Sequence, residues 1–204
     1  PAVFNVHVRP FVDAVWAGLR DPRAPVRAAS AAALRACLVL VEARETRYRV
    51  QWYHRLFEES RRGLDAPGAP PEAVLGSLAA LRELLAHTGE FMLARHREVA
   101  AAALAFAASR DPSLRSAALG LAPALAAFAP ERFADAYAAR FLEFCAASLA
   151  APGERLAAFA ALGATARALA SAGVASGLEA SLPAAAAAIA DALAAARAAA
   201  RAGG

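Results

Sequence analysis

The chain has 204 residues, a formal net charge of +4 at pH 7 and an apolar fraction of 59%. Alanine, the strongest intrinsic helix former, makes up about a third of it, and every one of its basic residues is arginine. Without lysine the segment cannot contain a Walker A phosphate loop, a Schiff-base lysine or the strand lysine of a protein kinase, which excludes those enzyme classes for it. The small net charge does not by itself indicate a nucleic-acid partner.

Apolar residues recur at a helical period along the chain, and proline or glycine separates many of these stretches. The pattern predicts at least eight helices, in chain order at residues 10–19, 26–41, 51–64, 72–86, 90–109, 112–128, 131–149, 154–170 and 182–201, the last rich in alanine. No stretch alternates apolar and polar residues over five positions, so we predict an all-α fold with helix content above about 70%.

Helix starts recur at a nearly constant spacing. They stand at Pro25, Pro71, Pro112 and Gly153, which gives steps of 46, 41 and 41 residues. This is the period of HEAT repeats, in which antiparallel helix pairs stack into a solenoid. We therefore predict a HEAT-repeat α-solenoid of about four to five repeats. Their expected bounds are residues 9–42, 50–87, 90–128 and 131–171, followed by the terminal helix 182–201.

The whole of residues 1–204 is interpreted as one HEAT-repeat segment. Because it begins at Pro1 rather than at a methionine, we expect a fragment of a much larger chain. Two cysteines, Cys37 and Cys145, lie in apolar helical stretches and are expected to be reduced core residues. Eight large apolar residues are expected to be buried between the helix layers: Leu34, Leu78, Leu81, Leu119, Leu121, Leu125, Phe159 and Leu162.

Two similar turns place a carboxylate before a helix and an arginine near its start. These pairs are Asp21 with Arg27, and Asp111 with Arg115. A guanidinium in this position suits charge-assisted hydrogen bonds to a carboxylate or carbonyl in its own or the neighbouring turn. We interpret the four residues as a structural ladder that links adjacent repeats, in preference to a catalytic arrangement.

The sequence offers no pattern for catalysis, cofactor binding or metal binding. It lacks the GxGxxG, GxSxG, HExxH and CxxC motifs, and its four histidines do not pair with cysteines or carboxylates at a convincing metal-ligand spacing. We therefore predict no catalytic residue, no cofactor and no metal within these residues.

Arginines and aromatic residues gather after the second predicted helix. We consider as a partner surface Arg44, Arg47, Arg49, Trp52, Tyr53, Arg61 and Arg62. Interleaved aromatic and basic side chains are typical of surfaces that bind phosphate or acidic partners. Acidic residues such as Glu42, Glu58 and Glu59 stand among these arginines and cancel most of their field. An ion-paired, solvated surface is therefore the plainer interpretation, and a protein-binding edge is the alternative.

Several short stretches together resemble one known family. ALRACL at residues 33–38, QWY at residues 51–53 and TGEFM at residues 88–92 occur in this order. Their succession resembles the N-terminal HEAT region of the target of rapamycin (TOR) protein kinases, and the resemblance spans roughly residues 4 to 195. The departures are mostly larger residues replaced by alanine, particularly after Ala184.

The resemblance implies a serine/threonine kinase of the phosphatidylinositol 3-kinase-related family, active in nutrient and growth signalling. Its catalytic domain, with ATP and Mg, would lie downstream, and this segment would mediate complex assembly. The partners implied are a Raptor-type regulatory subunit, a TOR dimer partner and a small GTPase, with no nucleic acid and no transmembrane segment. The implied location is the cytoplasm, the surface of lysosomal or vacuolar membranes, and the nucleus.

The residues alone leave two other classes open. One is a HEAT adaptor for nuclear transport or a phosphatase scaffold, which would lack a downstream kinase domain. The other is a basic solenoid that binds nucleic acid, whose binding would depend steeply on salt.

Overall fold

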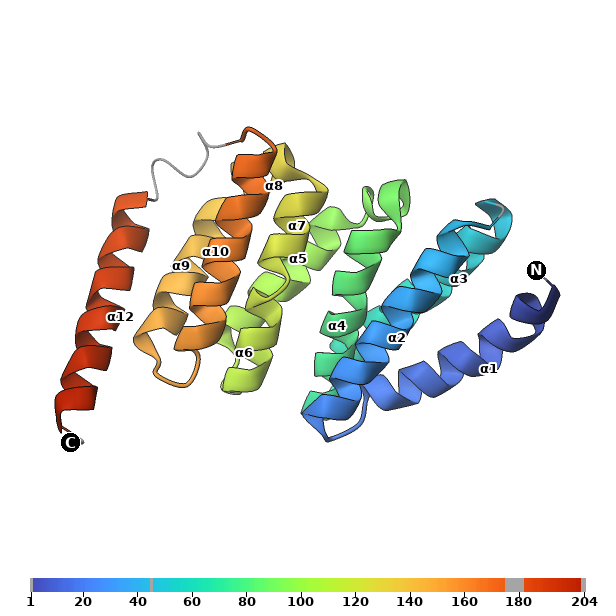
Figure 1. Ribbon diagram of the computed structural model, residues 1–204, viewed down its shortest axis with the longest axis horizontal. Coiled ribbons are helices and arrows are strands. Elements are labelled where there is room, and N and C mark those ends of the chain that lie inside the picture. The colour runs from blue at the N-terminus through green and yellow to red at the C-terminus, as the bar shows by residue number, and fades with distance from the viewer. Residues whose placement is uncertain (1, 45, 175–181, 203–204) are drawn as a thin grey trace. The chain divides into compact units, whose positions relative to one another are not determined.

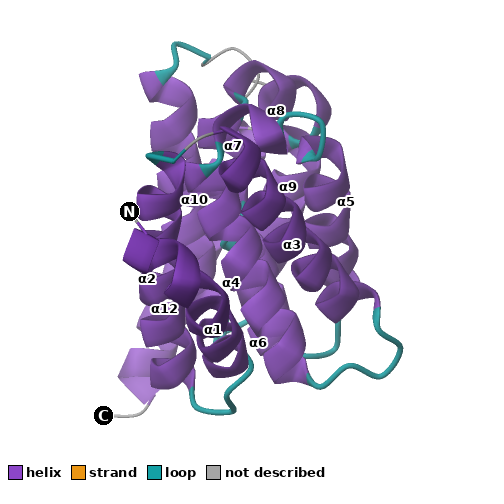
Figure 2. Cartoon of the chain, turned by 90° about the vertical axis from the view of Figure 1, so that its right-hand side faces the viewer, coloured by secondary structure: helices purple, strands orange, loops and turns teal. Residues whose placement is uncertain are grey.

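The computed structural model describes residues 2–44, 46–174 and 182–202. Helices account for most of the described residues, which contain no strand. Figure 2 shows only helices joined by loops in the described part. The all-α prediction is confirmed, and the fold is of the helical-repeat class. The chain divides into two compact units, residues 1–95 and residues 96–204, each with its own internal packing.

The first unit consists of four long helices and a short 3-10 helix (Figure 1). Their bounds are α1 Ala2–Leu19, α2 Ala24–Glu42, α3 Thr46–Asp65, α4 Pro71–His87 and η1 Gly89–Met92. Helix α4 is central, because α1, α2 and α3 all pack against it. Prolines at the starts of α2 and α4 occupy positions where a helix has no hydrogen bond for a backbone N–H to make.

Helix α2 shows how an alanine-rich sequence still defines a core face. Its residues Leu34, Leu38 and Val41 recur at helical spacing and are at most 3% exposed. By length and hydropathy alone α2 could also cross a membrane. In the structure one face of α2 packs against α1 and α4.

The second unit contains shorter helices. Their bounds are α5 His96–Ala105, η2 Phe106–Ala108, α6 Pro112–Leu119, α7 Ala122–Phe128, α8 Pro130–Ala136, α9 Ala138–Ala150, α10 Arg155–Ser171 and α12 Leu182–Ala202. Helix α10 packs against α7 and α9, and α12 packs against α9. The largest fully buried side chain is Phe133, whose ring lies 5.4 Å from that of Phe141.

Three predicted helices are interrupted in the structure. The helix expected at 112–128 breaks into α6 and α7, because Pro123 has no N–H to donate and its ring would clash with the preceding turn. The helix expected at 131–149 breaks at Tyr137, where the sequence has neither proline nor glycine to signal it. The stretch 90–109 is divided into η1, α5 and η2.

The first helix also differs from the prediction. It begins at Ala2, so that Pro10 lies inside α1 instead of at its start. Interior proline removes one helical hydrogen bond. A buried stripe of Val8, Val12 and Val15 continues across the proline, and this packing offsets the lost bond.

Most of the predicted core is buried. The side chains at most 2% exposed include Leu34, Leu78, Leu81, Leu119, Leu121 and Leu125. Phe159 and Leu162 are only partly buried, contrary to the prediction. Both cysteines are buried and unbridged. Burial raises the pKa of the Cys37 thiol to about 11 and that of Cys145 to about 12, which keeps both in the unreactive thiol form.

Candidate functional site

In the first predicted polar pair, the side chains of Asp21 and Arg27 bind other groups instead of each other. The Arg27 guanidinium donates to the backbone carbonyl oxygens of Asp21 and Pro22, at 2.8 Å each. The Asp21 carboxylate accepts instead from the backbone and side chain of Arg23, and these hydrogen bonds lower its pKa. Arg27 therefore fastens the start of α2 to the turn that follows α1, while Asp21 organises that turn.

In the second predicted pair, the two side chains also bind other residues instead of each other. The Asp111 carboxylate caps α6 by accepting from the backbone N–H and hydroxyl of Ser113, at 2.8 and 2.6 Å. Arg115 reaches across to Glu154, donating through both Nε and Nη2, and also donates to the carbonyl of Ser109. Glu154 is 2% exposed and precedes α10. Arg115 thus links α6 to the turn before α10.

A second ion pair with a buried carboxylate was not predicted from the sequence. Glu83 of α4 is 2% exposed, and Arg35 of α2 donates to its two oxygens at 2.8 and 2.9 Å. Burial alone would raise the pKa of Glu83, but the hydrogen bonds and charge of Arg35, with a smaller contribution from Arg82, hold it below its ordinary value. The available signal was a carboxylate placed on the apolar face of α4, between Leu81 and Leu84.

Replacing Arg35 with alanine should destabilise the first unit by about 1–3 kcal/mol at neutral pH, because Glu83 stays buried without its bidentate donor. The folded-state pKa of Glu83 is lowered, so the pair stabilises the fold above the ordinary glutamate pKa of 4.5 and ceases to do so as the pH falls through the folded-state value. The difference between Arg35→Ala and the parent chain should therefore shrink in acid. Urea unfolding at a series of pH values measures it.

Arg82→Ala provides a matched control. Arg82 also reaches Glu83, but through a single contact of 3.4 Å, whereas Arg35 makes two shorter ones. The two arginine side chains are similarly exposed, at 49% and 52%, so the contrast lies in the contacts. We expect this variant to lose less stability than Arg35→Ala. Equal losses for the two variants, or a loss for Arg35→Ala that does not change with pH, would contradict the assignment.

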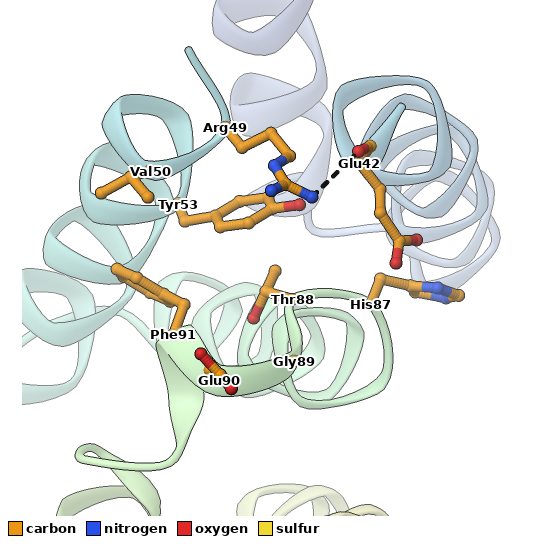
Figure 3. Close-up of a pocket in the computed structure, with 9 residues that line it drawn as sticks. All are labelled: Glu42, Arg49, Val50, Tyr53, His87, Thr88, Gly89, Glu90 and Phe91. Carbon is orange, nitrogen blue, oxygen red and sulfur yellow. Dashed lines mark hydrogen bonds between the residues drawn. The ribbon is translucent and has the colours of Figure 1, made fainter. Parts of the chain in front are cut away.

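A pocket of about 440 Å³ opens where the end of α2, the start of α3 and the end of α4 meet η1 (Figure 3). Nine residues line it: Glu42, Arg49, Val50, Tyr53, His87, Thr88, Gly89, Glu90 and Phe91. Arg49 donates to the backbone carbonyl of Glu42 at 3.2 Å, and the rings of Tyr53 and Phe91 are 5.5 Å apart. Within this lining no nucleophile lies at hydrogen-bonding distance from a base, so it offers polar and aromatic contacts.

The residues of the predicted arginine and aromatic surface differ in burial and in the groups that they contact. Tyr53 is 4% exposed and belongs to the core, whereas its neighbour Trp52 is only half-buried. Arg61 and Arg62 form ion pairs within α3, at 3.7 Å to Glu58 and 2.8 Å to Glu59. Arg49 lines the pocket, Arg44 is half-buried and Arg47 is exposed.

Trp52 instead belongs to a second hollow, on the side of α3 that meets α1. This hollow has a volume of about 430 Å³ and is lined by Arg9, Gln51, Trp52 and Arg55. Arg9, which is distant in the chain, was not among the residues predicted for this surface. Over the part of the chain that the structure describes, no group of His, Cys, Asp and Glu residues could hold a metal ion.

Proteins similar to this chain include TOR kinases. Over 167 residues it is 47% identical to "Serine/threonine-protein kinase TOR" of Arabidopsis thaliana and 46% identical to the protein of that name from Oryza sativa subsp. japonica. It is 29% identical over 169 residues to "Serine/threonine-protein kinase tor1" of Schizosaccharomyces pombe.

The two plant matches each cover 82% of this chain, which itself spans only about 7% of the length of those relatives. No protein-family model and no solved structure matches the chain. The plant matches agree with the resemblance carried by the ALRACL, QWY and TGEFM stretches. The chain belongs to the TOR family, as one part of a much longer TOR protein.

Proposed function

We propose that this segment is a non-catalytic scaffold within the N-terminal HEAT region of a TOR serine/threonine kinase. The observation that carries the proposal is the 47% identity to a plant TOR kinase over 82% of the chain. Two features of the chain agree with it: each unit has a core of buried apolar side chains, and ion pairs connect its helices to other parts of the same unit. Helical repeats of this kind present extended surfaces to other proteins.

The scaffold would dock a Raptor-type regulatory subunit, contribute to TOR dimer assembly and receive a small GTPase. ATP and Mg would bind in a kinase domain elsewhere in the full-length protein, since this chain has no lysine for phosphate binding. The assembly would act in the cytoplasm, at lysosomal or vacuolar membranes and in the nucleus. By holding substrates near a distant active site, docking raises their effective concentration.

Deleting residues 10–170 from the full-length protein is the direct test. We expect the regulatory subunit or the dimer partner to be lost from the purified complex, because the docking surface is gone. The remaining protein should still phosphorylate a generic peptide, and this activity controls for misfolding of the kinase domain. An intact complex after the deletion would refute the scaffold role.

A second measurement addresses the non-catalytic assignment. The 204-residue chain is expected to show no ATP binding in equilibrium titration with a fluorescent ATP analogue. Saturable nucleotide binding at micromolar concentration would contradict the assignment, whatever the outcome of the deletion.

A further inference from the structure

The hollow between α1 and α3 combines positive charge with an aromatic face. On α3, Arg47, Gln51 and Arg55 follow one another at four-residue spacing, so they lie along one side of the helix. Gln51 and Arg55 line the hollow together with Trp52, and Arg9 of α1 lines it from the other helix. Its volume of about 430 Å³ is enough for one or two side chains of a binding partner.

One of these arginines is already held in place. The Arg55 guanidinium forms an ion pair with the Asp13 carboxylate of α1 and lies 5.3 Å from the centre of the Trp52 ring. A contact of this kind fixes the orientation of the indole as well as that of the guanidinium. Trp52 is thus held in a defined orientation in the lining of the hollow.

Two other arginines carry positive charge that is not paired with a described carboxylate. Arg9 and Arg47 are exposed, and neither forms an ion pair or hydrogen bond with the described residues. The lining of the hollow and the preceding turn of α3 thus carry the three guanidiniums of Arg9, Arg47 and Arg55, and only that of Arg55 forms an ion pair with a described carboxylate, Asp13. Farther along α3 the positive charge is neutralised, because Arg61 and Arg62 are paired there with Glu58 and Glu59.

We propose that this hollow, lined by Arg9, Gln51, Trp52 and Arg55, together with Arg47 one turn before Gln51 on α3, docks an acidic segment of a protein partner. Carboxylates of the partner would pair with Arg9 and Arg47, where the planar guanidinium allows two parallel hydrogen bonds. An apolar or aromatic side chain between them would cover the exposed part of Trp52, as an interface anchor does. The inference rests on the proposed scaffold function and assigns it a surface and a partner chemistry.

The charge pattern favours a protein segment over nucleic acid. A polyanion needs an extended basic track, because its affinity comes from many phosphate contacts. Here the positive stretch is short, and Glu58 and Glu59 follow one turn after Arg55 on the same helix. A compact acidic segment with one apolar residue matches this short stretch better.

The test is fluorescence anisotropy with the full 204-residue chain and a labelled glutamate-rich peptide that contains one phenylalanine. We expect saturable binding that weakens with added salt. The double variant Arg9→Glu and Arg47→Glu should bind the peptide about tenfold more weakly or worse, because two attractive pairs become repulsive. Trp52→Ala should also weaken binding, by removing the apolar anchor.

The matched control changes the same charge elsewhere. Arg97 and Arg140 are exposed residues of the second unit, and reversing both to glutamate should alter the affinity by less than about twofold. Circular dichroism checks that every variant keeps its helix content. Failure of the peptide to bind, or equal losses in the two double variants, would overturn the proposal. Tighter binding of a single-stranded oligonucleotide at the same site would also overturn it, in favour of nucleic acid.

The outcomes separate this inference from the scaffold proposal. If the 10–170 deletion abolishes complex assembly but the Arg9 and Arg47 reversals leave peptide binding intact, only the docking surface is refuted. If the deletion leaves assembly intact while the reversals abolish peptide binding, the hollow binds acidic segments and the scaffold role is refuted.

Discussion

Replacing Gly76 with alanine should destabilise the first unit by about 2–3 kcal/mol, even though alanine is the better helix former. A Cβ atom at position 76 of α4 would lie 2.2 Å from the carbonyl oxygen of Leu19 and 2.8 Å from its carbonyl carbon. Both atoms belong to the backbone at the end of α1, so no change of rotamer relieves the overlap. The end of α1 would have to move away from α4, and the intrinsic gain of about 1 kcal/mol for alanine over glycine offsets only part of this cost.

Gly163→Ala in α10 is the control for helix propensity. A Cβ atom there would meet only the Nη1 atom of Arg167, at an ordinary contact distance of 3.6 Å. This variant should be unchanged or stabilised by up to about 1 kcal/mol. Urea unfolding of both variants measures the contrast. Similar midpoints for Gly76→Ala and Gly163→Ala would show that α1 and α4 do not approach closely at Leu19.

Truncating Leu34 to alanine is expected to cost about 2–4 kcal/mol. Leu34 is 0% exposed in the middle of α2, so its removal loses the burial of the side chain and leaves a cavity that the neighbouring helices fill only in part. The loss should appear as a lower urea midpoint with little change in the slope of the transition.

Leu156→Ala is the matched control for the same chemical change. Leu156 is 84% exposed at the start of α10, and its truncation should alter the free energy of unfolding by less than about 0.5 kcal/mol. If the two leucine variants unfolded at the same urea concentration, the burial of Leu34 would be contradicted.

These two sites illustrate what periodicity can and cannot predict. Leu34 was predictable because a large apolar residue recurs every three or four positions along α2, which defines an inward face without reference to any other helix. The contact at Gly76 was not, because it depends on where the end of a different helix crosses α4. In sequence, Gly76 is one more small residue in a helix full of alanine.

Alanine also explains the errors in the predicted core. Helix α10 is apolar around much of its circumference, so its sequence does not select one face. Its buried positions include the small residues Ala158 and Ala161, while Phe159 and Leu162 remain partly exposed. Where large residues are scarce, a helix can bury small side chains and leave larger ones at the surface.

For the polar contacts, the sequence indicated the arginine of each contact but not its partner. Arginine close to a helix start indicated an interaction with a turn, but it did not identify Glu154 as the partner of Arg115, 39 residues away in the chain. The same applies to the hollow beside Trp52, whose fourth lining residue, Arg9, comes from a different helix. Adjacent Trp52 and Tyr53 were grouped as one surface, although neighbouring positions on a helix point in different directions.

The buried carboxylates have a consequence for how the helices are aligned. Alanine-rich faces carry only shallow ridges, so they offer little resistance to one helix sliding along another. A slip of one turn, about 5.4 Å, would carry Arg35 away from Glu83, or Arg115 away from Glu154, and leave a carboxylate buried without its donor. In each unit a bidentate ion pair with a buried carboxylate thus favours one position of a helix along its axis. Without this pair, the shallow alanine-rich surface would tolerate several such positions.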